Sequence, residues 1–255
     1  MAPKKGEAGE VVLAFDAYGT LLSTKSIADK LATYVGRDEA GTIAATWRKY
    51  QLEYTWRLNS MDQYEDFSKV TRRSLKHALG ESDVALDEQQ IEDMMQAYDS
   101  LSCFPDVAQT LQDLQTSPHL RAVIFSNGTH SMVSSSVRNS PDLSPHAATF
   151  DDIVVVEEVR KFKPAPATYR HLAKTVGKDP DSLEDMGTLW LVSGNPFDVV
   201  GARKVGMNAI WVDREDGGWR DSLFEGERGR PTEVVGGLDR VVGTVMGYYG
   251  GVLND

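Results

Sequence analysis

Five short, mostly apolar runs constrain the fold of this chain more than any other feature. The runs are rich in Val, Ile and Leu, and they cover residues 11–15, 121–125, 153–156, 189–192 and 209–212. Runs of this kind are typical of strands buried on both faces in a parallel sheet. Between the runs, apolar residues recur at helical spacing, as in Val107, Leu111 and Leu114. The alternation predicts an α/β fold with a doubly wound parallel sheet, a Rossmann-like core.

A helical insertion is predicted after the first run. Residues 22–103 have no strand pattern, and their apolar side chains recur at helical spacing, first at Ile43, Trp47, Tyr50 and Tyr54 and later at Ile91, Met94, Met95, Tyr98 and Leu101. We therefore expect a helical cap over residues 22–103, and a core formed by residues 1–21 and 104–255. Residues 214–237 are rich in glycine and charge, which predicts a loop.

Charge and cysteine content limit the partners that this chain can have. The 255 residues have a formal net charge of -11 at pH 7, which disfavours binding to nucleic acid or to an anionic membrane. One cysteine, Cys103, allows no internal disulfide, and with five His it offers no Cys/His metal cluster. The opening segment MAPKKGEAGE has no apolar stretch, and no run approaches the roughly 18 apolar residues of a membrane span. We expect a cytoplasmic protein without a metal or another cofactor.

Polar residues follow the predicted strands where a parallel sheet binds its ligands. Asp16 follows the first run, Ser126 and Asn127 follow the second, and SGNPFD at 193–198 follows the fourth. Lys163 comes shortly after the third run. Because the carboxyl ends of parallel strands meet at one edge of the sheet, we expect these side chains to share a site.

Each of these features also has a purely structural explanation. Asp16 could open a turn, Ser-Asn-Gly is a common turn sequence, and Lys163 could be a solvated charge. Residues 195–198 would make a sound helix start, with asparagine as the N-cap and proline in the first turn. The joint occurrence of these features, in order and at strand ends, favours a functional site.

Four segments together resemble the motifs of the haloacid dehalogenase superfamily: FDAYGTL, FSNG, KFKPAPATY and SGNPFD. The resemblance implies that Asp16 is a covalent carboxylate nucleophile. Phosphatases of this superfamily carry a second Asp two residues after the nucleophile, which protonates the leaving alkoxide, and an acidic pair that helps to hold Mg²⁺. This chain has Tyr18 and Asn195 at those positions. A lost carboxylate weakens a site for a hard cation, and a departing halide needs no proton, so the pattern favours carbon–halogen cleavage.

Within the superfamily, the sequence most resembles the (S)-2-haloacid dehalogenases of type II. WRKYQLEYTW at residues 47–56 is similar to a segment of that group, and Arg48 matches its halide-binding arginine. The resemblance implies catalytic roles for Asp16, Lys163, Ser193, Asn195 and Asp198. It implies substrate-binding roles for Ala17, Tyr18, Thr20, Arg48, Leu52, Phe67, Ser126, Asn127, Tyr169 and Phe197. Lys49, Gly194 and Phe197 stand where Gln, Ser and Trp are often found, which bears on substrate size rather than on reaction class.

The implied reaction has two steps. Asp16 attacks C2 of an (S)-2-haloacid opposite the halogen, which expels halide, inverts C2 and forms an aspartyl ester. Water then attacks the ester carbonyl. Lys163 is expected to keep Asp16 ionised and to be held by Asp198 and Ser193. Asn195 and Asp198 are expected to position the water.

The resemblance also implies which residues bind each end of the substrate. Ser126 and the backbone N–H groups of Ala17 and Tyr18 are expected to hold the carboxylate. The halide is expected to lie against Arg48, Asn127 and the ring edge of Phe197. A homodimer is typical of the resembled group.

Two other functions stay open on the sequence. The first is a phosphatase of the same fold, against which Tyr18 and Asn195 argue. The second is a non-catalytic binding protein that keeps the fold, against which the retained Asp16, Lys163 and Asp198 argue.

Overall fold

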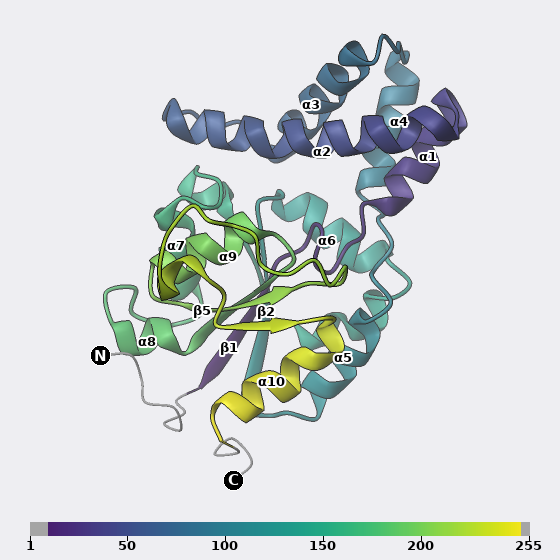
Figure 1. Cartoon of the computed structure of the whole chain (residues 1–255). Coiled ribbons are helices and arrows are strands. Elements are labelled where there is room, and N and C mark those ends of the chain that lie inside the picture. The colour runs from purple at the N-terminus through teal and green to yellow at the C-terminus, as the bar shows by residue number, and fades with distance from the viewer. Residues whose placement is uncertain (1–9, 251–255) are drawn as a thin grey trace.

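A six-stranded sheet forms the centre of the structure, a computed structural model that describes residues 10–250 (Figure 1). The strands lie in the order β3-β2-β1-β4-β5-β6, and every pairing is parallel. Their bounds are Val11–Phe15 for β1, Leu120–Ser126 for β2, Asp152–Val155 for β3, Leu189–Ser193 for β4, Asn208–Val212 for β5 and Glu233–Val235 for β6. The predicted doubly wound parallel sheet is confirmed.

The central strands are apolar because both of their faces are covered. Every residue of β1, β4 and β5 is buried. Phe15, the last residue of β1, pairs with Ile124 in β2 and with Val192 in β4. The three strands therefore end together, and the residues that follow them emerge at one edge of the sheet.

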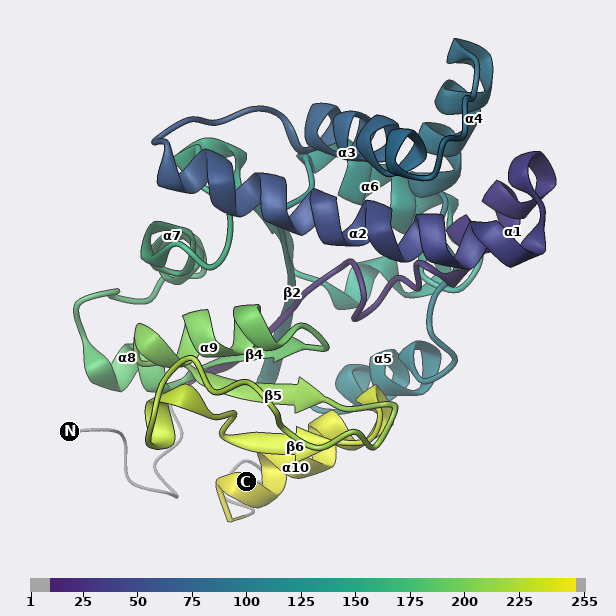
Figure 2. The same cartoon turned by 45° about the horizontal axis from the view of Figure 1, so that its top comes forward.

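The helices of the core cover both faces of this sheet (Figures 1 and 2). Helices α7, α8 and α9 gather on one face, and α5, α6 and α10 lie on the other. Their bounds are Val107–Gln115 for α5, His130–Asn139 for α6, Pro166–Thr175 for α7, Leu183–Gly187 for α8, Pro196–Lys204 for α9 and Val241–Tyr248 for α10. Short 3-10 helices lie at Ser144–Thr149, Val156–Val159, Glu227–Gly229 and Leu238–Arg240.

Four helices between β1 and α5 pack together beyond the sheet edge at which the strands end (Figure 1). They are α1 at Lys25–Val35, α2 at Arg37–Ser60, α3 at Phe67–Glu81 and α4 at Glu88–Tyr98. Ile43 and Trp47 of α2 are buried, in agreement with the helical spacing. Leu101 is also buried, but it lies beyond the end of α4, so the expected helical pattern ran three residues too far. The division at 21/22 and 103/104 into core and cap stays a prediction, and we use the word cap for α1–α4.

One element was missed by sequence reasoning. Residues 214–237 were expected to be a loop, but they contain β6, which extends the sheet beside β5. The strand has three residues, and Val234 at its middle is 50% exposed. A short edge strand that is covered on one side only carries too little apolar pattern to be seen in a sequence.

No helix within residues 10–250 is both long enough and apolar enough to cross a membrane. The segment MAPKKGEAG, where no secretory signal is expected, lies outside the described residues.

Candidate active site

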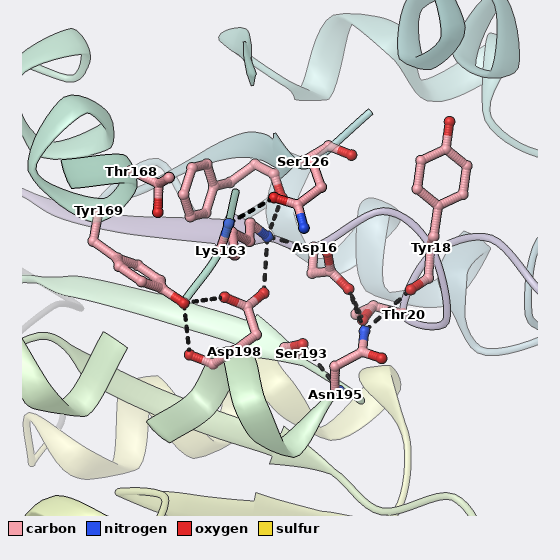
Figure 3. Close-up of polar contacts among 12 residues, drawn as sticks. Asp16, Tyr18, Thr20, Ser126, Lys163, Thr168, Tyr169, Ser193, Asn195 and Asp198 are labelled. Carbon is pink, nitrogen blue, oxygen red and sulfur yellow. Dashed lines mark hydrogen bonds and ion pairs between the residues drawn. The ribbon is translucent and has the colours of Figure 1, made fainter. Parts of the chain in front are cut away.

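Asp16 lies directly after β1, and its carboxylate is held from three sides (Figure 3). Lys163 Nζ lies 3.1 Å from Oδ1, while Thr20 Oγ1 and Asn195 Nδ2 each donate to Oδ2 at 2.8 Å. The turn that carries Thr20 back toward Asp16 needs Gly19, whose φ of 88° suits glycine. Asp16 is only 6% exposed, so these contacts hold its carboxylate in one fixed orientation.

Lys163 is buried and binds two carboxylates. Its Nζ donates to Asp198 Oδ2 at 2.8 Å and to the carbonyl oxygen of Phe125 at 2.7 Å, in addition to its contact with Asp16. Burial alone would lower the pKa of Lys163, but Asp16 and Asp198 outweigh it and raise this pKa above the ordinary value. Lys163 therefore stays an ammonium ion, and the structural alternative of a solvated charge is wrong.

Asp198, in the first turn of α9, lies beneath the Asp16 carboxylate and is wholly buried. Burial raises the pKa of Asp198 above its ordinary value, against the opposing effect of Lys163. Its second oxygen, Oδ1, accepts a 2.7 Å hydrogen bond from the hydroxyl of Tyr169. Tyr169, expected to line the pocket, is instead fully buried behind Asp198 (Figure 3). A Cβ at Gly201 would lie 2.3 Å from this hydroxyl, so glycine there makes room for the contact.

The segment after β4 brings Asn195 to Asp16. As the helix-start interpretation expected, Asn195 is the N-cap residue of α9, but its side chain makes no capping bond. Its Nδ2 donates instead to Asp16 Oδ2 and to the carbonyl oxygen of Tyr18, the latter at 3.1 Å. The expectation that Ser193 holds Lys163 is wrong: Ser193 Oγ accepts from the backbone N–H of Asn195 at 3.0 Å. Through this bond, Ser193 stabilises the turn that follows β4.

The presence of glycine rather than serine at position 194 also has a structural explanation. A Cβ at this position would lie 2.7 Å from the carbonyl oxygen of Gly19, so a larger residue would push the two loops apart. The backbone N–H of Gly194 donates to Thr20 Oγ1 at 3.0 Å, and Thr20 in turn donates to Asp16. Gly194, at a position where serine is often found, therefore allows the loops that hold Asp16 to pack closely.

Ser126 and Asn127 follow β2, and both are buried. Ser126 Oγ accepts from the backbone N–H of Gly128 at 3.0 Å, which is the turn contact of the structural explanation, but the hydroxyl keeps its own hydrogen to donate. Asn127 Oδ1 accepts from the backbone N–H of Lys163 at 2.8 Å. Within residues 10–250, no hydrogen-bond acceptor is recorded for the backbone N–H groups of Ala17 and Tyr18. These donors are the groups that an anionic ligand would require.

The cap also brings a positive charge, that of Arg48, to the residues around Asp16. Arg48 of α2 is half-buried, and its Nη2 donates to the carbonyl oxygen of Tyr18 and to Asn195 Oδ1, both at 3.3 Å. Leu52, one turn further along α2, is also half-buried. Phe67 of α3 stacks on the Tyr18 ring at a centroid distance of 5.8 Å. Arg48, which helical spacing places on the same face of α2 as Leu52, therefore contacts the core.

Phe197 and Lys49, two of the departures, lie in different surroundings. The Phe197 ring meets the edge of Trp56 from the cap at a centroid distance of 5.4 Å. Phe197 therefore lies where cap and core meet. Lys49 is exposed, with its Nζ 5.8 Å from the Tyr50 ring, so this departure lies on the surface of α2.

Sequence reasoning missed two polar residues of α2 that contact the site or its supports. Gln51 is buried and accepts a hydrogen bond from Arg48. Asn59 pairs its side-chain amide with both backbone groups of Phe162, at 2.7 and 2.9 Å, next to Lys163. A signal existed for Gln51, because a polar residue four positions after buried Trp47 lies on an apolar helix face. No comparable signal existed for Asn59.

Taken together, the fold and the site define an α/β enzyme core that presents one lysine-bound carboxylate at its strand ends, beneath a helical cap. Within residues 10–250, no group of three or more His, Cys, Asp or Glu side chains is placed to hold a metal ion. The model of the haloacid dehalogenase-like hydrolase family matches residues 11–206, and the chain belongs to that family.

The chain is also similar to individual haloacid dehalogenases. An (S)-2-haloacid dehalogenase of Xanthobacter autotrophicus is 37% identical over 203 residues, which cover 79% of this chain and 74% of the relative. The (S)-2-haloacid dehalogenase 4A of Burkholderia cepacia is 32% identical, with 79% and 82% covered. The solved L-2-haloacid dehalogenase of Xanthobacter autotrophicus with chloropropionic acid covalently bound superposes with a TM-score of 0.81 at 30% identity, covering 94% of this chain and 99% of that one.

Proposed function

We propose that this enzyme hydrolyses the carbon–halogen bond of small (S)-2-haloalkanoic acids and releases (R)-2-hydroxyacids, through a covalent ester on Asp16. The observation that carries the proposal is the position of Arg48. A cap arginine reaches Asn195, which itself holds the carboxylate of Asp16, so one side chain links the cation to the nucleophile. The similarity to (S)-2-haloacid dehalogenases supports this substrate class.

In the first step, a carboxylate oxygen of Asp16 forms a bond to C2 while the carbon–halogen bond breaks, and the halide leaves with the electron pair. No proton is transferred. The contacts of Asp16 with Lys163, Thr20 and Asn195 hold the nucleophile in one direction, which lowers the entropic part of the barrier.

The two ends of the substrate meet different donors. We assign its carboxylate to the hydroxyl of Ser126 and to the backbone N–H groups of Ala17 and Tyr18. We assign the halide to Arg48, to the amide of Asn127 and to the ring edge of Phe197. Apolar side chains, Leu52 and Phe67 with the Tyr18 ring, enclose the carbon chain between these ends.

In the second step, water attacks the carbonyl carbon of the ester. The bond between this carbon and the oxygen attached to C2 then breaks. One proton of the water passes to that oxygen and the other is released to solvent, so the hydroxyacid leaves with an oxygen from Asp16 and Asp16 returns to a carboxylate. The ammonium of Lys163 stabilises the negative charge that develops on the carbonyl oxygen. Asn195 lies close enough to orient the water. Because both oxygens of Asp198 are bonded, to Lys163 and Tyr169, we assign Asp198 the role of holding Lys163 in place.

A phosphatase reaction receives less support from the same residues. The acid that would protonate a leaving alkoxide is replaced by Tyr18, whose ring contacts those of Phe67 and Tyr98. Burial raises the pKa of the Tyr18 phenol well above its ordinary value. Asn195 supplies an amide where a second metal-binding carboxylate would lie.

Halide release tests the proposal. With EDTA present, (S)-2-chloropropionate should be dehalogenated, and the (R) enantiomer should react far more slowly, because Asp16 attacks from one side only. Equal rates on both enantiomers, a strict Mg²⁺ requirement, or faster hydrolysis of p-nitrophenyl phosphate with Mg²⁺ would overturn it.

We also propose that the enzyme works in the cytoplasm as a homodimer, with the haloacid as its ligand and with neither nucleic acid nor a membrane as a partner. The net charge of -11 supports the last part. Light scattering of the purified protein tests the dimer, and a monomer at micromolar concentration would contradict it.

A further inference from the structure

Gln51 is a buried amide on α2 with a hydrogen bond on each side. Gln51 is 1% exposed. The oxygen Oε1 accepts from Arg48 Nη1 at 2.6 Å and from the hydroxyl of Tyr98 at 3.0 Å. The nitrogen Nε2 donates to Thr71 Oγ1 at 2.8 Å. A buried amide that is hydrogen-bonded at both its oxygen and its nitrogen has one orientation, with its oxygen toward Arg48.

The partners of Gln51 are themselves fixed by neighbouring helices. Thr71 of α3 donates its hydroxyl to the carbonyl oxygen of Phe67 at 2.7 Å, so its lone pairs face Nε2 of Gln51. The carbonyl oxygen of Thr71 accepts from Trp47 Nε1 at 2.8 Å. The Tyr98 ring of α4 packs on Trp47 at a centroid distance of 5.5 Å. Three helices of the cap therefore hold the acceptor that Arg48 uses.

The acceptors of Arg48 are all uncharged. They include Gln51 Oε1, the carbonyl oxygen of Tyr18 and Asn195 Oδ1. No ion pair with an acidic residue is recorded for Arg48 in the part of the chain that the structure describes. Neutral acceptors fix the direction of a guanidinium without cancelling its charge, and this charge then acts on an anion more strongly than in bulk water.

We propose that Gln51 is a positioning residue for the dehalogenation. It holds the guanidinium of Arg48 through a neutral oxygen, so that the positive charge stays available to the departing halide. The inference rests on the proposed function, in which Arg48 receives the halide. The competing explanation is that Gln51 only satisfies buried polar groups of the cap.

Two substitutions separate position from charge. Gln51→Met keeps the approximate volume and removes the acceptor. We expect kcat on (S)-2-chloropropionate to fall roughly 10- to 100-fold, with a smaller change in KM, because charge develops on the halogen only as the bond breaks. Gln51→Glu keeps an acceptor for Arg48 but adds a negative charge. We expect it to lower kcat as well and to weaken product inhibition by chloride or bromide.

A double-mutant cycle and two further variants complete the test. If Gln51 acts through Arg48, then Arg48→Ala with Gln51→Met should be no slower than Arg48→Ala alone, within about twofold. Gln96→Met, at an exposed position on α4, is the matched control and should match wild type. Thr71→Val loosens Gln51 from its other side and should give a milder loss, which keeps the test usable if a Gln51 variant fails to fold.

Three outcomes would overturn the inference while leaving the proposed function intact. They are wild-type kcat and halide inhibition in Gln51→Glu, multiplied losses in the double variant, and unchanged kinetics in Thr71→Val together with Gln51→Met. Near-normal turnover in Arg48→Ala would have a different meaning, because it would remove the halide role on which the proposed function depends.

Discussion

Two cations meet near Asp16, and the core and the cap hold them in opposite ways. Lys163 of the core is 1% exposed and binds two carboxylates. Arg48 of the cap is half-buried and binds only neutral oxygens. A paired cation orders the groups around it, whereas an unpaired one keeps its field for a ligand. The core therefore fixes the carboxylate of Asp16, and the cap leaves one cation without an acidic partner, as the proposed halide role of Arg48 requires.

This difference also separates stability from activity. Removal of one member of a buried ion pair leaves an uncompensated charge, which commonly costs about 3–5 kcal/mol of folding free energy. Removal of a half-buried arginine without an ion-pair partner leaves no such charge behind. Variants of the core site should therefore affect folding and turnover together, and variants of the cap site should affect turnover alone.

The largest effect is expected from Asp16→Asn. The amide is a poor nucleophile, so halide release should fall by more than about a thousandfold. Substrate binding should persist, because the carboxylate and halide contacts involve other residues. Ion chromatography of released chloride and calorimetric titration with (S)-2-chloropropionate measure the two quantities. A variant with a tenth of wild-type turnover would place the nucleophile elsewhere.

Lys163→Met should remove both activity and stability. It leaves Asp16 and Asp198 buried without their cation, and we expect the free energy of unfolding to fall by about 3–5 kcal/mol in urea titrations. A loss below about 1 kcal/mol would show that the pair carries little of the folding energy.

The pH dependence of this loss has a definite sign. The pKa of Lys163 is raised in the folded state above its ordinary value of 10.5. The stability gained from its ion pairs is therefore complete below that value and is lost as pH rises through the folded pKa. The gap in unfolding free energy between wild type and Lys163→Met should be level from neutral pH to about 10 and should shrink only above it. A gap that already shrinks near neutral pH would contradict the direction of the shift.

Arg48→Ala should affect turnover but not folding. We expect a loss of roughly 100-fold in kcat, with a change in unfolding free energy below about 1 kcal/mol. Arg48→Lys should also be poor, because a point charge replaces a planar fork of donors. Steady-state kinetics and urea titration on the same samples check both parts. A strongly destabilised Arg48→Ala would make this residue part of the fold and weaken the comparison.

The smallest effect is expected at the tip of the cap. Asn59→Ala removes both hydrogen bonds to Phe162 and should lower the unfolding free energy by about 1–2 kcal/mol. Turnover should fall only a few-fold, because Lys163 keeps its own contacts. Asp62→Asn, which breaks an exposed ion pair with Lys161 nearby, is the control and should change neither quantity measurably. Equal losses in the two variants would argue against a specific role for Asn59.

The same two regions differ in how well a sequence predicts them. Asp16, Asn195 and Lys163 could be expected to meet because parallel strands end at one edge, so order along the chain implies proximity in space. Finer details did not follow, since the partner of Ser193 and the depth of Tyr169 depend on side-chain directions at the strand ends.

Contacts of the cap were harder to anticipate. Helical spacing placed Arg48 on a face with Leu52, but it could not say that Gln51 would turn inward between α3 and α4 or that Asn59 would reach Phe162. These contacts depend on how four helices pack on one another and on the core, which a repeat of three to four residues does not specify.

Covalent attack by Asp16 distinguishes this mechanism from direct hydrolysis by water, and isotope labelling separates the two. Attack by Asp16 on C2 and direct attack by water both invert C2, so stereochemistry cannot separate them, but the origin of the product oxygen can. In a single turnover with enzyme in excess in ¹⁸O water, we expect unlabelled (R)-lactate from (S)-2-chloropropionate and label in the peptide that contains Asp16. Labelled lactate with an unlabelled Asp16 peptide would contradict it.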